Sequence, residues 1–141
     1  MATPAFRPHG TAQVELSGAI LTVHMRGDWN AEMRSQTAQQ MRKYAPALNA
    51  AAPWAICNVL HDTLVYSEAL YTSARQDYAS RPAASRLQAV AFVIGPHVEG
   101  ASLLGPRYQT LLEGVIDARV FPDQQSAHLW LQEQLDRARQ S

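Results

Sequence analysis

Histidine, aspartate and aromatic residues stand shortly after three apolar stretches of this 141-residue chain. Histidine and aspartate side chains can move protons or bind a metal ion. If the three stretches are neighbouring parallel strands, the residues after them share one edge of the sheet, where open α/β sheets bind ligands. The candidate residues of this partner or ligand rim are Asp28, Trp29, His61, Asp62, Thr63 and His97.

The pattern of these residues matches no catalytic or metal motif. The histidine spacing fits no metal-binding motif, and histidine and aspartate in loops also form turns and cap helices. The chain has no Gly-x-Ser-x-Gly elbow, and Cys57 lies in an apolar stretch, where cysteine acts as a small hydrophobic residue. We therefore predict a non-enzymatic protein with no metal and no cofactor. The competing hypothesis, an enzyme or metalloprotein, requires the side chains of His61, Asp62 and His97 to lie within about 10 Å of one another.

The amino-acid composition narrows the class of protein and of partner. Hydrophobic residues make up 47% and charged residues 17%, which favours one folded domain over disorder. The 12 basic and 12 acidic residues give no net charge, so no long-range field attracts nucleic acid or an anionic membrane. The single cysteine excludes an internal disulfide, and no apolar run approaches the roughly 20 residues that span a bilayer. Residues 1–10 lack the apolar core of a secretory signal, so we expect a cytoplasmic protein.

Apolar periodicity predicts an α/β fold in the order β-β-α-β-α-β-α-β-α. Period-two stretches predict strands, and apolar residues recurring every three or four positions predict helices. Residues 1–11 are predicted to be a flexible tail, and residues 12–138 a single domain. The predicted strands are Ala12–Leu16, Ile20–Met25, Trp54–Leu60, Leu87–Ile94 and Asp117–Phe121. The predicted helices cover 30–48, 67–81 and 100–113 and a final segment capped by Asp123.

Two of these patterns determine where the candidate residues lie relative to the predicted sheet. The first two strands form a hairpin around Ser17-Gly18, and strands separated by helices are parallel neighbours joined by right-handed crossovers. Trp54–Leu60 is almost continuously apolar, which is typical of a central strand covered on both faces. Pro106 either starts its helix or kinks it.

This order resembles the STAS domains of anti-sigma-factor antagonists and a single-domain branch labelled STAS/SEC14-like. The resemblance covers Ala12 to Leu135 and depends on three local features. An opening hairpin leads into the glycine-bearing loop 27–30, and a buried strand leads through a short loop to a helix at Ser67. The ending Arg119–Asp123 with its following helix is similar to the SEC14-like branch. The resemblance implies a bacterial, regulatory domain that acts by protein–protein contact.

Ser67 has two interpretations. In phosphorylatable antagonists the loop after the central strand carries Asp-Ser-(Ser/Thr)-Gly, and its first serine takes the phosphate. Ser67 matches that serine, but Tyr66 and Ala69 replace the Asp and the Gly, and Glu68 adds a negative charge. Ser67 is therefore either a phosphorylation site or only the N-cap of its helix, with Tyr66 and Tyr71 as a hydrophobic staple.

The sequence leaves two further hypotheses about partners. The leading one is an unidentified protein partner bound at the rim, with Tyr66 and Ser67 added to the residues above. The alternative is a carrier of a small apolar ligand or lipid, which requires a pocket of roughly 300 Å³ or more between sheet and helices. A homodimer is also predicted as an option, because an edge strand of the opening hairpin can pair across a two-fold axis.

Overall fold

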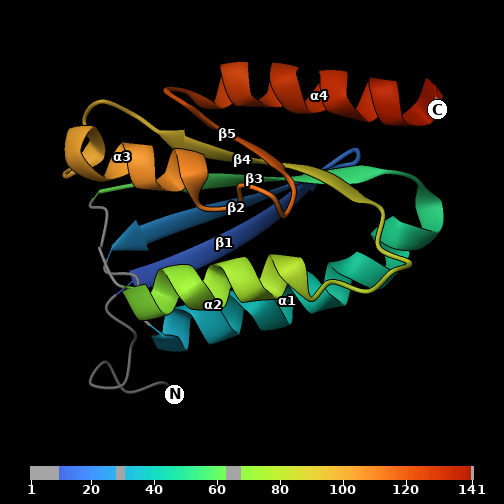
Figure 1. Cartoon of the computed structure of the whole chain (residues 1–141), viewed down its shortest axis with the longest axis horizontal. Helices are drawn as coiled ribbons and strands as arrows, with labels where there is room; N and C mark the ends of the chain where they lie inside the picture. Colours follow the sequence, from blue (N-terminus) through green and yellow to red (C-terminus); the bar gives the residue numbers. More distant parts are fainter. Residues whose placement is uncertain (1–9, 28–30, 63–67, 141) are drawn as a thin grey trace.

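Five strands form one mixed sheet whose spatial order, β1-β2-β3-β4-β5, is also the order along the chain (Figure 1). This computed structural model describes residues 10–27, 31–62 and 68–140. β1 is antiparallel to β2, and the other neighbouring pairs are parallel. The strands are β1 Gly10–Ser17, β2 Ile20–Gly27, β3 Trp54–Leu60, β4 Leu87–Ile94 and β5 Asp117–Phe121. The predicted fold class and element order are confirmed.

The opening hairpin turns one residue later than the sequence suggested. β1 runs through Ser17, and the two turn residues are Gly18 and Ala19. Gly18 has a φ of +60°, whereas Ala19 is not among the residues with positive φ. Glycine followed by a residue of ordinary φ is the pattern of a type II′ turn, whose twist matches that of the two strands. This turn therefore fixes the register of β1 on β2.

The helices cover the two faces unequally. Their bounds are α1 Ala31–Ala51, α2 Glu68–Ala79, α3 Ala101–Thr110 and α4 Gln124–Gln140. Successive right-handed crossovers between strands laid side by side put their helices on one face. Accordingly residues of α1, α2 and α3 pack into one core, and Figure 1 shows α1 and α2 below the sheet and α4, which follows the last strand, above it. None of the described helices is long and apolar enough to cross a membrane.

Alternating side chains of the central strands fill two separate cores. On β3, Ile56 points to the side of α1–α3 and Cys57 to the side of α4, and both are buried. The α1–α3 side holds large residues, including Leu21, Phe92 and Tyr108. The α4 side of the central strands carries small ones. They are Ala55, Cys57, Ala89 and Ala91, followed along the strands by Val59 and Val93, and they pack with Ala127, Leu131 and Leu135 of α4.

Some helix ends differ from the predicted ones. Pro106 lies inside α3 and does not start it, and α3 ends at Thr110, before the predicted Glu113. Gly114, with a φ of +78°, lies in the turns that follow. The cap predicted for the last helix is confirmed, because the Asp123 carboxylate accepts a 2.7 Å hydrogen bond from the Ser126 N–H.

Candidate functional site

The loops that follow β3 and β4 are tied to each other and to β2 by backbone hydrogen bonds. The N–H of His61 donates to the carbonyl of Met25 at 2.9 Å, and the N–H of Glu99 donates to the carbonyl of Asp62 at 2.8 Å. These bonds join the ends of three neighbouring parallel strands. We call His61, Asp62, His97 and Glu99 the carboxyl rim. The sequence predicted that residues after these strands would share one edge, and for His61, Asp62 and His97 the structure shows this edge.

Asp62 has an unusual backbone conformation. Its φ is +64°, and it is the one non-glycine residue with positive φ among those that the structure describes. A left-handed conformation costs an L-residue roughly 1–2 kcal/mol, although aspartate tolerates it better than most. The conformation reverses the chain directly after β3 and leaves the Asp62 side chain exposed. Backbone strain of this kind is common at functional sites, which supports Asp62 as a candidate site residue.

The ring of His97 folds back onto the backbone of Gly95. A Cβ added to Gly95 would stand 2.6 Å from Cε1 and 2.8 Å from Nδ1 of the His97 ring. The exposed ring of His97 thus occupies the space beside Gly95 that a Cβ would need. A larger residue at this position would have to displace the ring.

His24 and His61 form a direct hydrogen bond between their rings. Nδ1 of His24 lies 3.0 Å from Nε2 of His61, the ring centroids are 5.3 Å apart, and the ring planes differ by 24°. The centroid separation equals the nitrogen–nitrogen distance plus the two ring radii. The two nitrogens therefore face each other edge to edge, as in an N–H···N hydrogen bond.

The carboxylate of Glu15 indicates which ring donates. Its Oε2 lies 3.8 Å from Nε2 of His24, and the side chain of His24 is only 14% exposed. An N–H at Nε2 of His24 faces this anion favourably, which leaves Nδ1 of His24 as the acceptor. We therefore assign the proton of the shared bond to Nε2 of His61.

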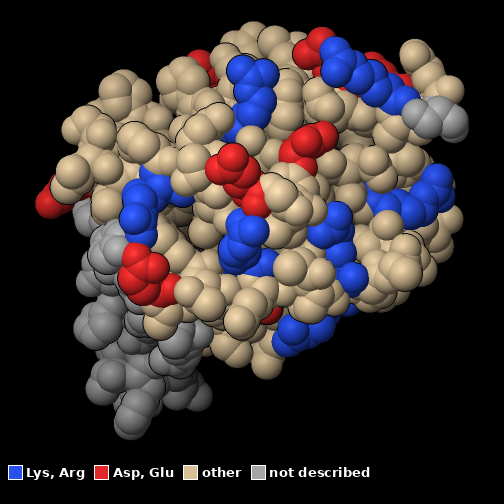
Figure 2. Space-filling view, in the orientation of Figure 1, with Lys and Arg blue, Asp and Glu red and all other residues tan. Residues whose placement is uncertain are grey.

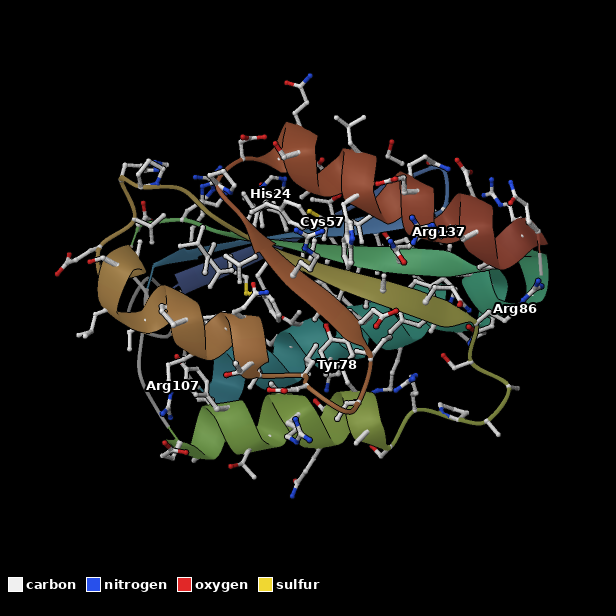
Figure 3. All side chains as sticks on the ribbon, turned by 45° about the horizontal axis from the view of Figure 1, so that its top comes forward. His24, Cys57, Tyr78, Arg86, Arg107 and Arg137 are labelled. Atoms are coloured by element: carbon white, nitrogen blue, oxygen red, sulfur yellow. The ribbon has the colours of Figure 1, made fainter. Side chains whose placement is uncertain are left out.

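A third histidine, His128, belongs to α4 and faces β2. Nε2 of His128 is 3.3 Å from the hydroxyl of buried Thr22 and 3.4 Å from the amide nitrogen of Gln124. We call His24, His61 and His128 the histidine network. Figure 3 shows His24, with Cys57, in the layer between the sheet and α4.

Burial favours the neutral forms of His61 and His128. Burial lowers the pKa of His61 below its usual 6.5, and the positive charges of Arg26, His24 and His97 lower it further against the opposing effect of Asp62. Burial also lowers the pKa of His128, with a smaller contribution from His24.

The sequence argument missed His24, His128 and Thr22. Thr22 and His24 alternate with the buried apolar Leu21 and Val23, so the second strand has one face with polar groups. His128 stands next to Ala127 on the helix side that faces the sheet. These three side chains lie within regular elements, whereas the residues predicted from the sequence follow strands. The alternation of polar and apolar residues along the second strand was the sequence signal that could have revealed Thr22 and His24.

Among the described residues the structure shows no metal-ligand cluster and no activated thiol. No group of three or more His, Cys, Asp or Glu among the described residues is arranged to hold a metal ion. The two nitrogens of His24 and His61 that face each other at 3.0 Å are occupied by their own hydrogen bond. Burial raises the pKa of the Cys57 thiol to about 12, which disfavours the reactive thiolate.

Five candidate residues lie outside the described part of the chain: Asp28, Trp29, Thr63, Tyr66 and Ser67. The phosphorylation of Ser67 and the hydrophobic staple with Tyr66 therefore stay predictions. Glu68, the next residue, begins α2 and forms an ion pair with Arg107. The Arg107 guanidinium also lies 5.6 Å from the ring centroid of Tyr71, and Figure 3 shows it beside the start of α2.

A groove of about 670 Å³ lies between the hairpin turn and α4. Leu129, which is 66% exposed, forms part of its wall, and His128 of the histidine network opens onto it. The lining residues are Ser17, Gly18, Ile20, Gln124, Gln125, His128, Leu129 and Gln132. The groove is open to solvent and combines amide groups with two aliphatic side chains.

Comparison with protein-family models, with curated proteins and with solved structures gave no match to this chain. The resemblance to STAS domains therefore stays a prediction from the sequence.

Proposed function

We propose that this protein is a non-enzymatic regulatory domain that binds a partner protein through the carboxyl rim. The observation that carries the proposal is the bond from the Glu99 N–H to the Asp62 carbonyl, together with that from His61 to Met25. These bonds hold the described residues at the ends of β2, β3 and β4 together before a partner arrives. A surface fixed in advance loses less conformational entropy when its partner arrives.

The chemistry of the carboxyl rim suits a protein surface. Asp62, His97 and Glu99 are exposed, and Arg26 is exposed at the end of β2, so both signs of charge are present. Leu103 is 78% exposed in α3, which begins directly after the rim. An exposed aliphatic side chain beside polar groups is a suitable anchor for a protein interface.

The wider surface agrees with a neutral partner site. On the face shown in Figure 2, acidic and basic side chains are interspersed and form no large area of one sign. The chain as a whole has no net charge. Such a surface favours short-range recognition over long-range attraction of a polyanion.

The test compares two exposed leucines. The partner is first isolated by co-purification with the full chain, and its Kd is then measured by calorimetry. Leu103→Asp is expected to weaken binding at least about tenfold, since a charge would enter the interface. Leu129→Asp, at another exposed position on α4, is the control and is expected to leave the Kd unchanged. A Leu103→Asp variant that binds like the wild type would contradict the proposal, as would an equal loss in both variants.

The carrier of a small apolar ligand is the second candidate, and the groove beside α4 is the observation that favours it. Its volume of about 670 Å³ exceeds the roughly 300 Å³ of the smallest ligand pockets, and it includes Ile20 and the exposed Leu129. A ligand bound there would raise the melting temperature, and Leu129→Asp would abolish the rise. No rise with fatty acids or phospholipids at concentrations near their solubility limits would exclude this function.

A further inference from the structure

The two edges of the sheet are protected to different degrees. β5 has five residues, and the N–H of Val120 donates to the side-chain Oε1 of Gln109 at 2.9 Å. The Arg119 guanidinium covers the rings of Phe121 and Trp130 at 5.5 and 5.7 Å. A short strand, a side-chain cap and a charged cover are all means by which proteins prevent a sheet edge from pairing with another chain.

β1, at the other edge, is less protected in the part of the chain that the structure describes, and its one charged residue is Glu15. It has eight residues, pairs with β2 in an unbroken register from Gly10↔Gly27 to Ser17↔Ile20, and contains no lysine, no proline and no bulge. Leu16 is 48% exposed although it belongs to this strand. In the described sheet β1 has a strand on one side only. A long, regular edge strand of this kind presents a row of hydrogen-bonding groups to another strand.

The hairpin turn determines which groups point outward. In a two-residue hairpin the residues flanking the turn, here Ser17 and Ile20, form a hydrogen-bonded pair. Hydrogen-bonded and non-hydrogen-bonded pairs then alternate along the ladder. The odd-numbered residues of β1 therefore bond to β2, and the backbone N–H and C=O groups of residues 10, 12, 14 and 16 point to the free edge.

We propose that this edge binds a second copy of the chain, with the two β1 strands antiparallel across a two-fold axis at Val14. The two sheets would then continue into one. In this register the two Val14 residues exchange both backbone bonds, and Leu16 of each copy stands opposite residue 12 of the other. A two-fold pairing uses the same strand twice, so a regular strand with outward groups on alternate residues is complementary to itself.

Side-chain chemistry selects this register among the neighbouring ones. Centred on Val14, the pairing puts Glu15 opposite Gln13 and places two β-branched valines side by side, which is a favourable cross-strand pair. Centred on Glu15, it would put two carboxylates opposite each other, which is destabilising. Centred on Gln13, it would replace the valine pair with two amides. The interface lies on a different part of the molecule from the carboxyl rim, so the dimer does not depend on the proposed function.

Disulfide cross-linking tests the register. Because Cys57 is buried and its pKa is raised to about 12, a single introduced cysteine gives an unambiguous product. We expect Val14→Cys in the full chain to form a disulfide-linked dimer under mild oxidation. Gln13→Cys, on the opposite face of the same strand, and Leu129→Cys, on α4, are expected to stay largely unlinked. Preferential linking of Gln13→Cys, or equal linking of all three, would overturn the proposed register.

Sedimentation of unlinked protein tests the dimer itself. Val14→Pro removes one outward N–H from each copy without touching the bonds to β2, and Leu16→Lys adds a charge at the edge. Each is expected to raise the dimer dissociation constant about tenfold or more, whereas Leu129→Lys leaves it unchanged. Circular dichroism confirms that the variants fold. A wild-type chain that sediments as a monomer at all accessible concentrations would overturn the proposal.

Discussion

The two faces of the sheet differ in what their side chains do. The face toward α1–α3 is packed with large apolar groups, such as Ile56 and Phe92, and serves to hold the fold together. The face toward α4 is lined with alanines in its centre and carries Thr22 and His24 along β2. One sheet thus combines a face filled mainly by large apolar groups with a face that carries histidines at its border. The predictions below test this division.

The largest effect is expected from a cavity on the structural face. The ring of Phe92 is 5% exposed and meets the Tyr108 ring edge-on, with the centroids 5.4 Å apart. Phe92→Ala removes the ring and leaves a void, which costs about 3–5 kcal/mol in free energy of unfolding. Urea denaturation measures this loss. A cost below about 1 kcal/mol would mean that this face is not tightly packed.

A smaller effect is expected from overfilling the opposite face. Ala91 is fully buried under Leu131 and Leu135 of α4, so a larger side chain has no free space. Ala91→Leu should cost about 1–3 kcal/mol by the same measurement. Leu129→Ala, on the exposed side of α4, is the control and should change stability by less than about 0.5 kcal/mol. If Ala91→Leu left the free energy of unfolding unchanged, the alanines would not determine the distance between α4 and the sheet.

The histidine network predicts a loss of stability on acidification. Because burial lowers the pKa of His61 and of His128 below 6.5, the unfolded chain binds protons more readily than the folded one below that pH. The free energy of unfolding should be highest above about pH 6.5 and decrease as the pH falls toward the lowered values. Urea denaturation at several pH values measures the slope.

A variant of His128 tests whether this residue causes the dependence of stability on pH. His128→Gln removes a titrating ring but keeps an amide that can bond to the Thr22 hydroxyl, so the dependence on pH should become shallower. A steeper dependence in the variant, or a wild-type protein that gains stability as the pH falls, would show that His128 is not held neutral by burial.

The smallest effect is expected at the cap of α4. The Ser126 N–H bond lowers the pKa of the exposed Asp123 carboxyl, which is the sign of a bond to its ionised form. Asp123→Ala should lower the melting temperature slightly, and Asp123→Asn should retain most of the wild-type value because asparagine is also a good N-cap. A variant with alanine that melts like the wild type would show that the cap contributes nothing measurable.

The sequence predicted the order of elements because each apolar pattern had a distinct period. Trp54–Leu60 and Leu87–Ile94 match their predicted strands. Apolar runs of this length are typical of strands that are buried on both faces. The helix ends were less predictable. Apolar residues continue past Thr110, but the chain leaves the helix before the left-handed Gly114, and the pattern of apolar residues does not record backbone angles.

The candidate site was predicted in part. The rule that parallel strands end at one edge placed His61, Asp62 and His97 together, and this needed only the topology. The bond between His24 and His61 depends on the register of β2 with β3, where His24 stands beside Val59. A register is set by contacts far apart in the sequence, so this pair could not be derived from spacing. His128 likewise depends on how α4 lies across the sheet.

Amide hydrogen exchange of the Glu99 N–H tests the central claim, a carboxyl rim fixed before its partner binds. The bond to the Asp62 carbonyl predicts that this amide exchanges far more slowly than an unstructured amide in the free protein, and more slowly again with the partner bound. Exchange of the free protein at the rate of an unstructured chain would contradict the account.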